Sequence, residues 1–270
     1  MNNLHRELAP ISDAAWEQIE EETTRTLKRY LAGRRVVDVP APGGIGLPAV
    51  GTGHLRPISA PAEGIVARQR EVKPLVEMRV PFEILRQTID DVERGSGDSD
   101  WQPAKDAAKK LAFAEDRAIF NGYREADIRG VSECTSNPIE TLPADVRDYP
   151  DAVAHALSQL RLVGVNGPYS VLLGAEEYTA LAETRDHGYP VLDHVKRIVD
   201  GNLIWAPAIE GAFVVTTRGG DFELNIGQDL SIGYLSHTDS SVQLYLQETF
   251  VFRVLTSEAA VVLSPVKKSS

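Results

Sequence analysis

Glu115 and Asp116 are the side chains that the sequence offers most directly for acid/base chemistry, because they are adjacent carboxylates; Glu93 is a third candidate. Both residues of the pair fall late in a predicted helix, where negative charge opposes the helix macrodipole. Ion pairing or capping explains these acids with fewer assumptions than catalysis does. We therefore expect a specific basic partner for the pair, with Arg124 and Arg129 as candidates.

The six histidines and the single cysteine form no recognisable reactive pattern. His187 and His194 are separated by a glycine and a proline and share no obvious helical turn, which disfavours a metal site. Cys134 follows an acid, and nearby acids raise the pKa of a thiol. No Gly-x-Ser-x-Gly, Walker or His-Glu-x-x-His motif is present, and Gly44-Ile-Gly46 only weakly resembles a phosphate loop. A Ser/His/Asp site that only folding would assemble is retained as an alternative.

The composition is that of a globular protein, with 43% hydrophobic and 25% charged residues in 270. A formal net charge of −11 argues against a general nucleic-acid binder, which is usually basic. No apolar run approaches the ~20 residues that span a bilayer, and residues 1–22 lack the apolar centre of a signal peptide. One cysteine allows no internal disulfide. We expect a cytoplasmic protein, whose release from the cell would need a non-classical route.

Two long helices organise the expected fold. The helix over residues 106–122 has small apolar residues at helical spacing and ends in an Asn-Gly pair, where glycine accepts the left-handed conformation. An earlier helix is capped by Ser12 or Asp13 and ends at Gly33, with basic residues in its last turn. Shorter elements are expected in the middle of the chain, as helices over 152–163, 176–183 and 191–199 and as a buried strand over 169–173.

Strands dominate the last third of the chain. The glycines at 219–220 lie between the apolar runs 213–217 and 222–226, and they predict a hairpin because both accept positive φ. Residues 242–247 alternate between apolar and polar side chains, which is typical of a strand with one wet face. Residues 259–263 are expected to form a buried strand, and 267–270 a polar tail.

A long two-stranded arm is expected earlier in the chain. Residues 40–61 are rich in glycine and proline and cannot hold a long helix. The runs 65–72 and 75–82 then provide two strands, interrupted by Pro74. Such an arm has little core of its own and is marginal in water unless another surface covers it.

Several short segments, taken in their order and number, resemble the encapsulin family of bacterial and archaeal shell proteins. The resemblance extends from Leu4 to about Leu263. The segments are Glu115-Asp116-x-x-Ile119-Phe120-x-Gly122 with Gly130-Val131, Arg6-x-x-Ala9-Pro10 with Trp16, Gly33-Arg34-Arg35 with Asp38-Val39, 91–95, Gly167-Pro168-Tyr169, Gly188-Tyr189-Pro190, 218–234, and Glu248-Thr249-Phe250-x-Phe252.

The resemblance implies an α+β fold of the tailed-phage major capsid type. It divides the chain into an N-terminal helix and the start of a peripheral domain (1–45), an extended arm loop (46–82), the peripheral domain with the spine helix (83–130), an axial domain (131–212) and a C-terminal β part of the peripheral domain (213–270). It also implies a non-enzymatic shell subunit without a cofactor. Sixty or more copies would close into an icosahedral nanocompartment that has no membrane span and binds no nucleic acid.

The family further implies a cargo enzyme, a dye-decolourising peroxidase or a ferritin-like protein, held by its C-terminal targeting peptide and serving in oxidative stress or iron storage. The peptide would dock between the first helix and a strand late in the chain. The alternative is that the residues expected to bind it belong to the hydrophobic core of the subunit. A turn of three residues is expected near a pore, unless it is only structural. The docking residues are Leu27, Tyr30, Leu31, Arg34, Asp38, Leu230, Ile232 and Tyr234, and the pore residues are His187, Gly188 and Tyr189.

Two other classes of protein stay open at this stage. A viral or proviral major capsid protein would share the fold but package nucleic acid, which usually calls for a basic inner surface, and the net charge is −11. A hydrolase or a secreted bacteriocin-like protein would need a nucleophile or a membrane-active helix, and the sequence displays neither.

Overall fold

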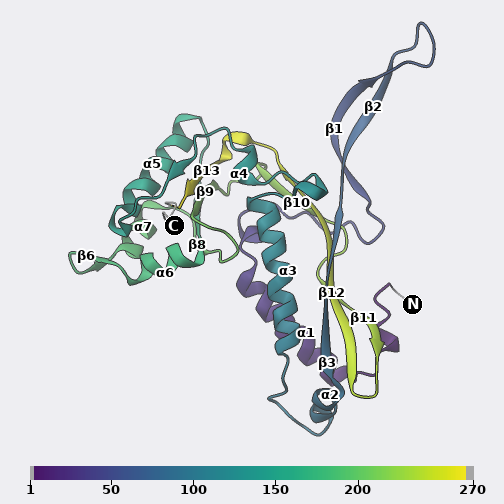
Figure 1. Ribbon diagram of the computed structural model, residues 1–270. Helices are drawn as coiled ribbons and strands as arrows, with labels where there is room; N and C mark the ends of the chain where they lie inside the picture. The colour runs from purple at the N-terminus through teal and green to yellow at the C-terminus, as the bar shows by residue number, and fades with distance from the viewer. Residues whose placement is uncertain (1–2, 266–270) are drawn as a thin grey trace, which may run out of the picture.

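A computed structural model describes residues 3–265, which form two β-sheets with helices packed on them and a projecting two-stranded arm (Figure 1). The helices are α1 (Asp13–Tyr30), α2 (Arg86–Glu93), α3 (Gln102–Phe120), α4 (Val131–Cys134), α5 (Tyr149–Leu162), α6 (Ala175–Glu183) and α7 (Val191–Ile198). The strands are β1 (Ala49–Ile58), β2 (Ala67–Pro74), β3 (Val76–Leu85), β4 (Glu140–Thr141), β5 (Tyr169–Leu173), β6 (Arg185–Asp186), β7 (Tyr189–Pro190), β8 (Leu203–Trp205), β9 (Ala212–Thr216), β10 (Phe222–Ile226), β11 (Ser231–His237), β12 (Ser241–Val254) and β13 (Ala260–Ser264). The lysine-rich tail expected at 267–270 lies outside the described residues.

The first sheet is built around β12, which pairs antiparallel with β3 on one side and with β10 and β11 on the other. Its apolar face alternates along β12, where Val242, Leu244 and Leu246 are fully buried. These residues pack in one hydrophobic cluster with the inner faces of α1, α2 and α3. The long helices α1 and α3 and the long strand β12, labelled in Figure 1, therefore share one hydrophobic core.

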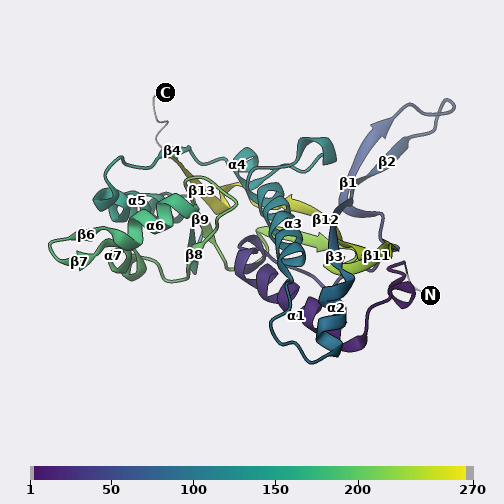
Figure 2. The same ribbon diagram turned by 60° about the horizontal axis from the view of Figure 1, so that its bottom comes forward.

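The second sheet has five strands in the order β4-β13-β9-β5-β8. The pairs β5–β8 and β13–β4 are parallel, and the two central pairs are antiparallel. All five residues of β5 are buried, as expected for a central strand covered on both faces. Figure 2 shows α5, α6 and α7 grouped beside this sheet, on the side of the molecule away from the arm.

The end of α3 joins the two sheets. Ile119 and Phe120 are fully buried, and the ring of Phe120 lies 5.0 Å from that of Phe213 on β9. Both sheets contribute residues to this cluster, including Phe250 of β12. Local signals predicted several elements within a few residues, since β5 has the expected bounds and α5 to α7 agree to within three positions. The spine helix starts at 102 rather than 106.

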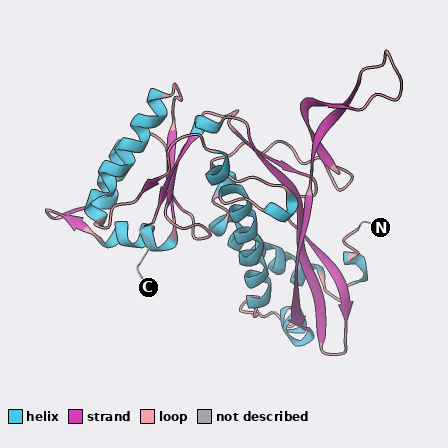
Figure 3. Cartoon of the chain, turned by 45° about the horizontal axis from the view of Figure 1, so that its top comes forward, coloured by secondary structure: helices cyan, strands magenta, loops and turns pink. Residues whose placement is uncertain are grey.

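The predicted pairing of the arm is wrong. The second predicted strand, β3, belongs to the first sheet, where Val76 pairs with Phe250 and Leu85 with Ser241. The arm instead consists of β1 and β2, so the glycine- and proline-rich segment supplies its first strand (Figure 3). The physical reason is burial: β3 alternates toward Phe82 and Ile84, which are buried on α3, whereas β2 has no buried residue.

The predicted hairpin at the two adjacent glycines is also wrong. Gly219 and Gly220 do adopt positive φ, +86° and +81°. However, β9 before them pairs with β5 and β13, and β10 after them pairs with β12. The turn therefore carries the chain from one sheet to the other, because β9 pairs on both sides within the second sheet and β10 pairs with the longer β12 of the first.

Candidate functional site

A groove of about 710 Å³ lies between α1 and the start of β11. Leu27 in the last turn of α1 and Leu31, which caps the end of the helix, are four residues apart and form one wall. Leu230 and Ile232 alternate along the chain and form the opposite wall. The groove is completed by polar side chains at its rim and by Leu246 of β12, and the remaining lining residues are Leu4, Arg6, Glu20, Thr23, Thr24, Lys28, Arg34, Arg35, Asp229 and Ser231.

Local sequence signals position the helical wall. The hydroxyl of Ser12 caps α1 by accepting a hydrogen bond from the Ala15 amide at 3.3 Å. The buried side of the helix includes Trp16 and Ile19, which pack in the core shared with β12. Leu27 continues this buried side toward the groove, so the wall is an extension of the core rather than a separate surface.

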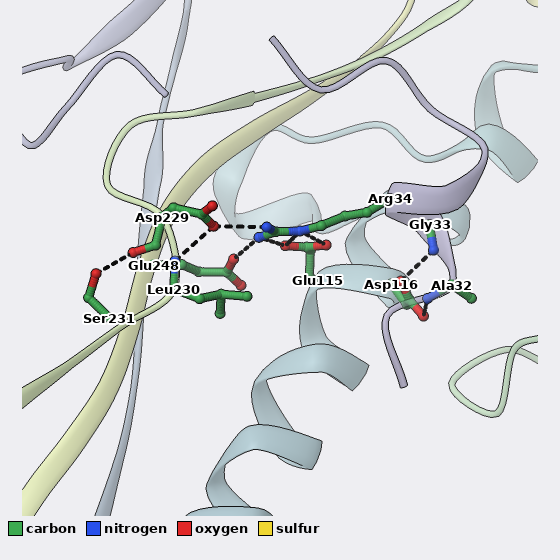
Figure 4. A network of polar contacts seen from close by, with 9 residues as sticks. All are labelled: Ala32, Gly33, Arg34, Glu115, Asp116, Asp229, Leu230, Ser231 and Glu248. Atoms are coloured by element: carbon green, nitrogen blue, oxygen red, sulfur yellow. Dashed lines mark hydrogen bonds and ion pairs between the residues drawn. The ribbon is translucent and has the colours of Figure 1, made fainter. Parts of the chain in front are cut away.

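Arg34 lines the groove and is the centre of a buried ionic network (Figure 4). Its guanidinium donates to Glu115 at 2.9 and 2.5 Å, to Glu248 at 3.0 Å and to Asp229 at 2.8 Å. The side chains of Glu115 and Glu248 are both fully buried. One cation therefore holds two inaccessible carboxylates and one exposed carboxylate.

The network perturbs the ionisation of its members. Burial raises the pKa of Glu248 well above its ordinary value, and the charge of Glu115 raises it further, while Arg34 opposes the rise. Burial acts to lower the pKa of Arg34, but the bonds to Glu115 and the charge of Glu248 more than offset it, so the pKa is raised. Arg34 thus stays charged, and the buried acids retain a permanent partner.

Asp116 anchors the turn that follows α1. Its carboxylate accepts the amides of Ala32 at 2.9 Å and Gly33 at 2.8 Å. Burial raises its pKa to about 7, although these two hydrogen bonds favour the charged form. A Cβ on Gly33 would lie 2.5 Å from Ile119 Cδ1, so only glycine permits this close approach.

The predicted partners of the acidic pair are therefore wrong. Arg129 donates to the carbonyl of Glu133 at 2.9 Å, and no contact joins either Arg124 or Arg129 to the pair within residues 3–265. The real partners, Arg34 and the two amides before it, come from a segment 81 to 84 positions earlier in the chain. The sequence did indicate that a specific partner was needed, but no local pattern could identify one so distant.

Five of the eight predicted docking residues line the groove: Leu27, Leu31, Arg34, Leu230 and Ile232. The other three do not line it. Tyr30 is turned about 100° from Leu31 around the helix and lies 5.6 Å from the rings of both Phe113 and Trp205. Asp38 accepts the Gly220 amide at 2.6 Å, and the Tyr234 hydroxyl lies 2.5 Å from His237 Nδ1.

Sequence reasoning missed several rim residues. The N-terminal segment reaches the groove because the carbonyl of Leu4 accepts the amide of Tyr234 at 2.8 Å, which no sequence pattern signals. Thr24 and Lys28 could have been found, since they flank the two wall leucines at helical spacing. Arg35 follows directly on Arg34 and also lines the groove.

The three predicted pore residues are consecutive in the chain and lie at the exposed turn between β6 and β7. None of them lines the groove. His187 and Gly188 connect β6 to β7, both with positive φ, 45° and 92°. Tyr189 is 65% exposed and begins β7. Figure 1 shows this two-stranded loop projecting from the α6–α7 side of the molecule.

Other reactive features of the chain are not arranged for catalysis. Burial, assisted by Glu133 and opposed by Arg129, raises the pKa of the Cys134 thiol, which disfavours the thiolate. Over residues 3–265, no cluster of three or more histidine, cysteine or acidic side chains is placed to hold a metal ion. No helix in that range is long and apolar enough to cross a membrane.

The spine helix, the arm and the two sheets together form a fold of the capsid type. It superimposes on a virus-like particle from Pyrococcus furiosus with a TM-score of 0.65 at 17% identity, covering 92% of this chain and 99% of that one. The capsid of Myoviridae phage XM1 matches with a TM-score of 0.52 at 11% identity, covering 87% and 92%. The expected α+β capsid-like fold is confirmed.

The family described as "Encapsulating protein for peroxidase" matches residues 1–251. A relative from Rhodococcus erythropolis, named a type 1 encapsulin shell protein, is 60% identical over 264 residues, which are 98% of this chain and 100% of the relative. The chain belongs to the encapsulin family. It is a structural shell protein that forms a capsid-like assembly, and a catalytic role is not part of that function.

Proposed function

We propose that this protein closes into an icosahedral shell of sixty or more copies and that the groove between α1 and β11 binds the terminal peptide of a cargo enzyme. The observation that carries the proposal is the groove itself, where Leu27 and Leu31 face Leu230 and Ile232. Short peptides bind through a few apolar anchors surrounded by polar groups. The groove offers both, at a volume that accommodates several side chains.

A dye-decolourising peroxidase or a ferritin-like protein is the proposed cargo. The matched family is described by its encapsulation of peroxidase, which favours the first of the two. The net charge of −11 per chain favours a protein cargo over packaged nucleic acid. Chemistry would then belong to the cargo, and the shell would control access to it.

The docking proposal is tested by filling the groove without disturbing the core. Thr24 is exposed and lines the groove, so Thr24→Trp places a large ring in the groove while Leu27 and Ile232 stay intact. Arg25→Trp is the matched control, since Arg25 is the adjacent exposed residue and does not line the groove. Shells co-expressed with the peroxidase are purified by size exclusion, and haem absorbance per shell is measured. We expect intact shells with little haem for Thr24→Trp and normal loading for the control; normal loading of both variants would reject the groove.

Assembly is supported by the arm, whose aliphatic side chains are largely uncovered within the subunit. Leu55, Ile58, Val66 and Val72 on or near β1 and β2 are each about half exposed or more. We propose that a neighbouring subunit covers them, because a two-stranded ribbon is marginal in water alone. A species of many subunits in size-exclusion chromatography is expected, and a stable monomer of 29.5 kDa would contradict closure.

The loop between β6 and β7 is the proposed pore element. The loop projects from the body of the subunit (Figure 1), where copies around a symmetry axis could surround an opening. The His187 side chain is 94% exposed, so His187→Ala removes it without affecting packing. We expect this change to alter the turnover of small substrates by loaded cargo. Unchanged turnover would remove this residue from the pore.

A further inference from the structure

The groove carries a charge opposite to that of the chain as a whole. Four basic side chains line it, whereas the only acids in the lining are Glu20 and Asp229, and the net charge of the protein is −11. A concave site lined by one sign of charge concentrates ligands of the other sign. The four basic residues are Arg6, Lys28, Arg34 and Arg35. They differ in the partners they already have within the subunit, and this difference decides which of them can bind a ligand.

Two of the four are committed to partners inside the subunit. Arg6 contacts Glu20 at 2.5 Å and lies over the Trp16 ring, 4.1 Å from its centroid. Arg34 is held by the buried carboxylates of Glu115 and Glu248 and by Asp229. These two cations are already neutralised and have a structural role, so they do not need a ligand.

Lys28 and Arg35 have no such partner. Neither side chain makes a hydrogen bond, an ion pair or a cation–π contact with any residue in the range 3–265. Both are exposed and both line the groove, one from α1 and the other from the turn after it. They add two uncompensated positive charges to a groove whose walls are otherwise aliphatic.

The hydroxyl of Thr23 is a second group in the lining without a partner. The residue is 4% exposed, and its Oγ1 has no hydrogen-bond partner among the described residues. A threonine in a helix commonly bonds the carbonyl four residues earlier, as Thr26 does to Glu22 at 2.8 Å. A buried polar atom without a partner is costly, and a ligand in the groove could supply one.

We infer that the occupant of the groove is a cargo peptide that carries a carboxylate within a few residues of two aliphatic anchors, and that Lys28 and Arg35 bind this carboxylate. The inference rests on the proposed docking function and specifies the chemistry of the partner. The anchors would pack between Leu27 and Ile232, and the carboxylate would lie at the basic rim. A lysine at the same position would meet two unpaired cations and be repelled.

The experiment uses a green fluorescent protein with a Gly/Ser-rich C-terminal tail that carries two leucines at alternate positions. One series places Asp, Asn or Lys directly before the first leucine, and a second series places them directly after the second. Each reporter is co-expressed with the full-length shell protein, and fluorescence per shell is measured after size exclusion. Two partly exposed ion pairs predict that the Asp tail loads about fivefold better than the Asn tail in at least one series, with the Lys tail lowest.

Shell variants assign this preference to named residues. In Lys28→Gln/Arg35→Gln shells, the three tails should load equally. The control Arg25→Gln/Arg29→Gln removes the same charge from side chains of α1 that do not line the groove, and it should keep the ranking. The inference is overturned if the three tails load alike in unmodified shells, if none of them loads, or if the ranking survives the loss of Lys28 and Arg35.

The failure of this inference can be told from failure of the docking function. If the peroxidase loads and Thr24→Trp blocks it while the three tails load alike, the groove stands and the charge preference is wrong. If Thr24→Trp leaves peroxidase loading unchanged, the groove is not the docking site at all.

Discussion

Replacing Arg34 by methionine would leave two fully buried carboxylates, Glu115 and Glu248, without their cation. Methionine retains much of the aliphatic length of arginine, so the loss is mainly electrostatic rather than a packing defect. Removing one partner of a buried ion pair costs about 3–5 kcal/mol, because an uncompensated charge remains in the interior. Total stabilities are about 5–15 kcal/mol, so Arg34→Met should remove about a fifth or more of the free energy of unfolding.

The free energy of unfolding that is lost in Arg34→Met should increase as pH rises. In the folded protein, burial and then the charge of Glu115 raise the pKa of Glu248 above its value in the unfolded chain. The folded state therefore holds a proton that the unfolded chain has already lost, and stability falls as pH rises through the folded pKa. Arg34 opposes this rise, so its loss raises the pKa of Glu248 further, and the free energy of unfolding lost in Arg34→Met should be larger at about pH 8 than at about pH 5.

Urea unfolding of assembled shells, followed by tryptophan fluorescence, measures this effect. Trp16 and Trp101 are buried in the core shared by α1, α3 and β12 and should report its loss. All samples need one protein concentration, because assembly contributes to apparent stability. Arg25→Met is the control, since Arg25 is 68% exposed and its one ion pair within the described part of the chain is with Glu22. Equal losses in Arg34→Met and Arg25→Met, or a deficit that does not change with pH, would refute the reasoning.

Three further predictions follow from other features of the subunit. The pKa of Asp116 is raised from 3.8 to about 7, so the stability that this side chain contributes falls as pH rises across that interval. Asp116→Asn should therefore flatten the pH dependence of the melting temperature in this interval. An unchanged slope would show that another group causes the pH dependence. A Cβ at Gly130 would lie 2.3 Å from the Gly122 amide nitrogen, so Gly130→Ala should sharply lower the yield of folded protein, whereas Gly46→Ala, with open space around it, should not. Replacing residues 52–70 by a short Gly/Ser turn should abolish shells but keep the subunit's circular dichroism spectrum, and intact shells by electron microscopy would show that the arm is dispensable.

Elements with local signals could be predicted from the sequence. Ser12 was identified as a possible cap and does accept the Ala15 amide, because capping involves residues only a few positions apart. The strand over 169–173 was predicted with its observed bounds, since a run of apolar residues between a Gly-Pro turn and a glycine can only be buried. Likewise, alternation at 242–247 marked part of the long central strand of the first sheet.

Features that depend on distant partners could not be predicted. The apolar runs on either side of Gly219 and Gly220 resemble a hairpin, but each pairs with a strand distant in sequence, Phe213 with β13 and Leu224 with β12. The acids of the spine helix needed Arg34, and nothing between positions 34 and 115 marks that pairing. Helical spacing placed Leu27 and Leu31 on the groove but also suggested Tyr30, whose ring instead packs beside Trp205 of the distant strand β8.

The position of the last strands has a consequence for how the protein is synthesised. β13, which ends at residue 264, lies between β4 and β9, and β12 lies at the centre of the other sheet. The helix α1 also packs on residues of β11 and β12, although it leaves the ribosome first. Domains usually fold as units from the N-terminus during translation, but the first sheet cannot form before β12 has emerged, nor the second before β13 has. A nascent chain that still lacks these strands therefore lacks the surfaces that shell closure needs, which keeps incomplete subunits out of the assembly.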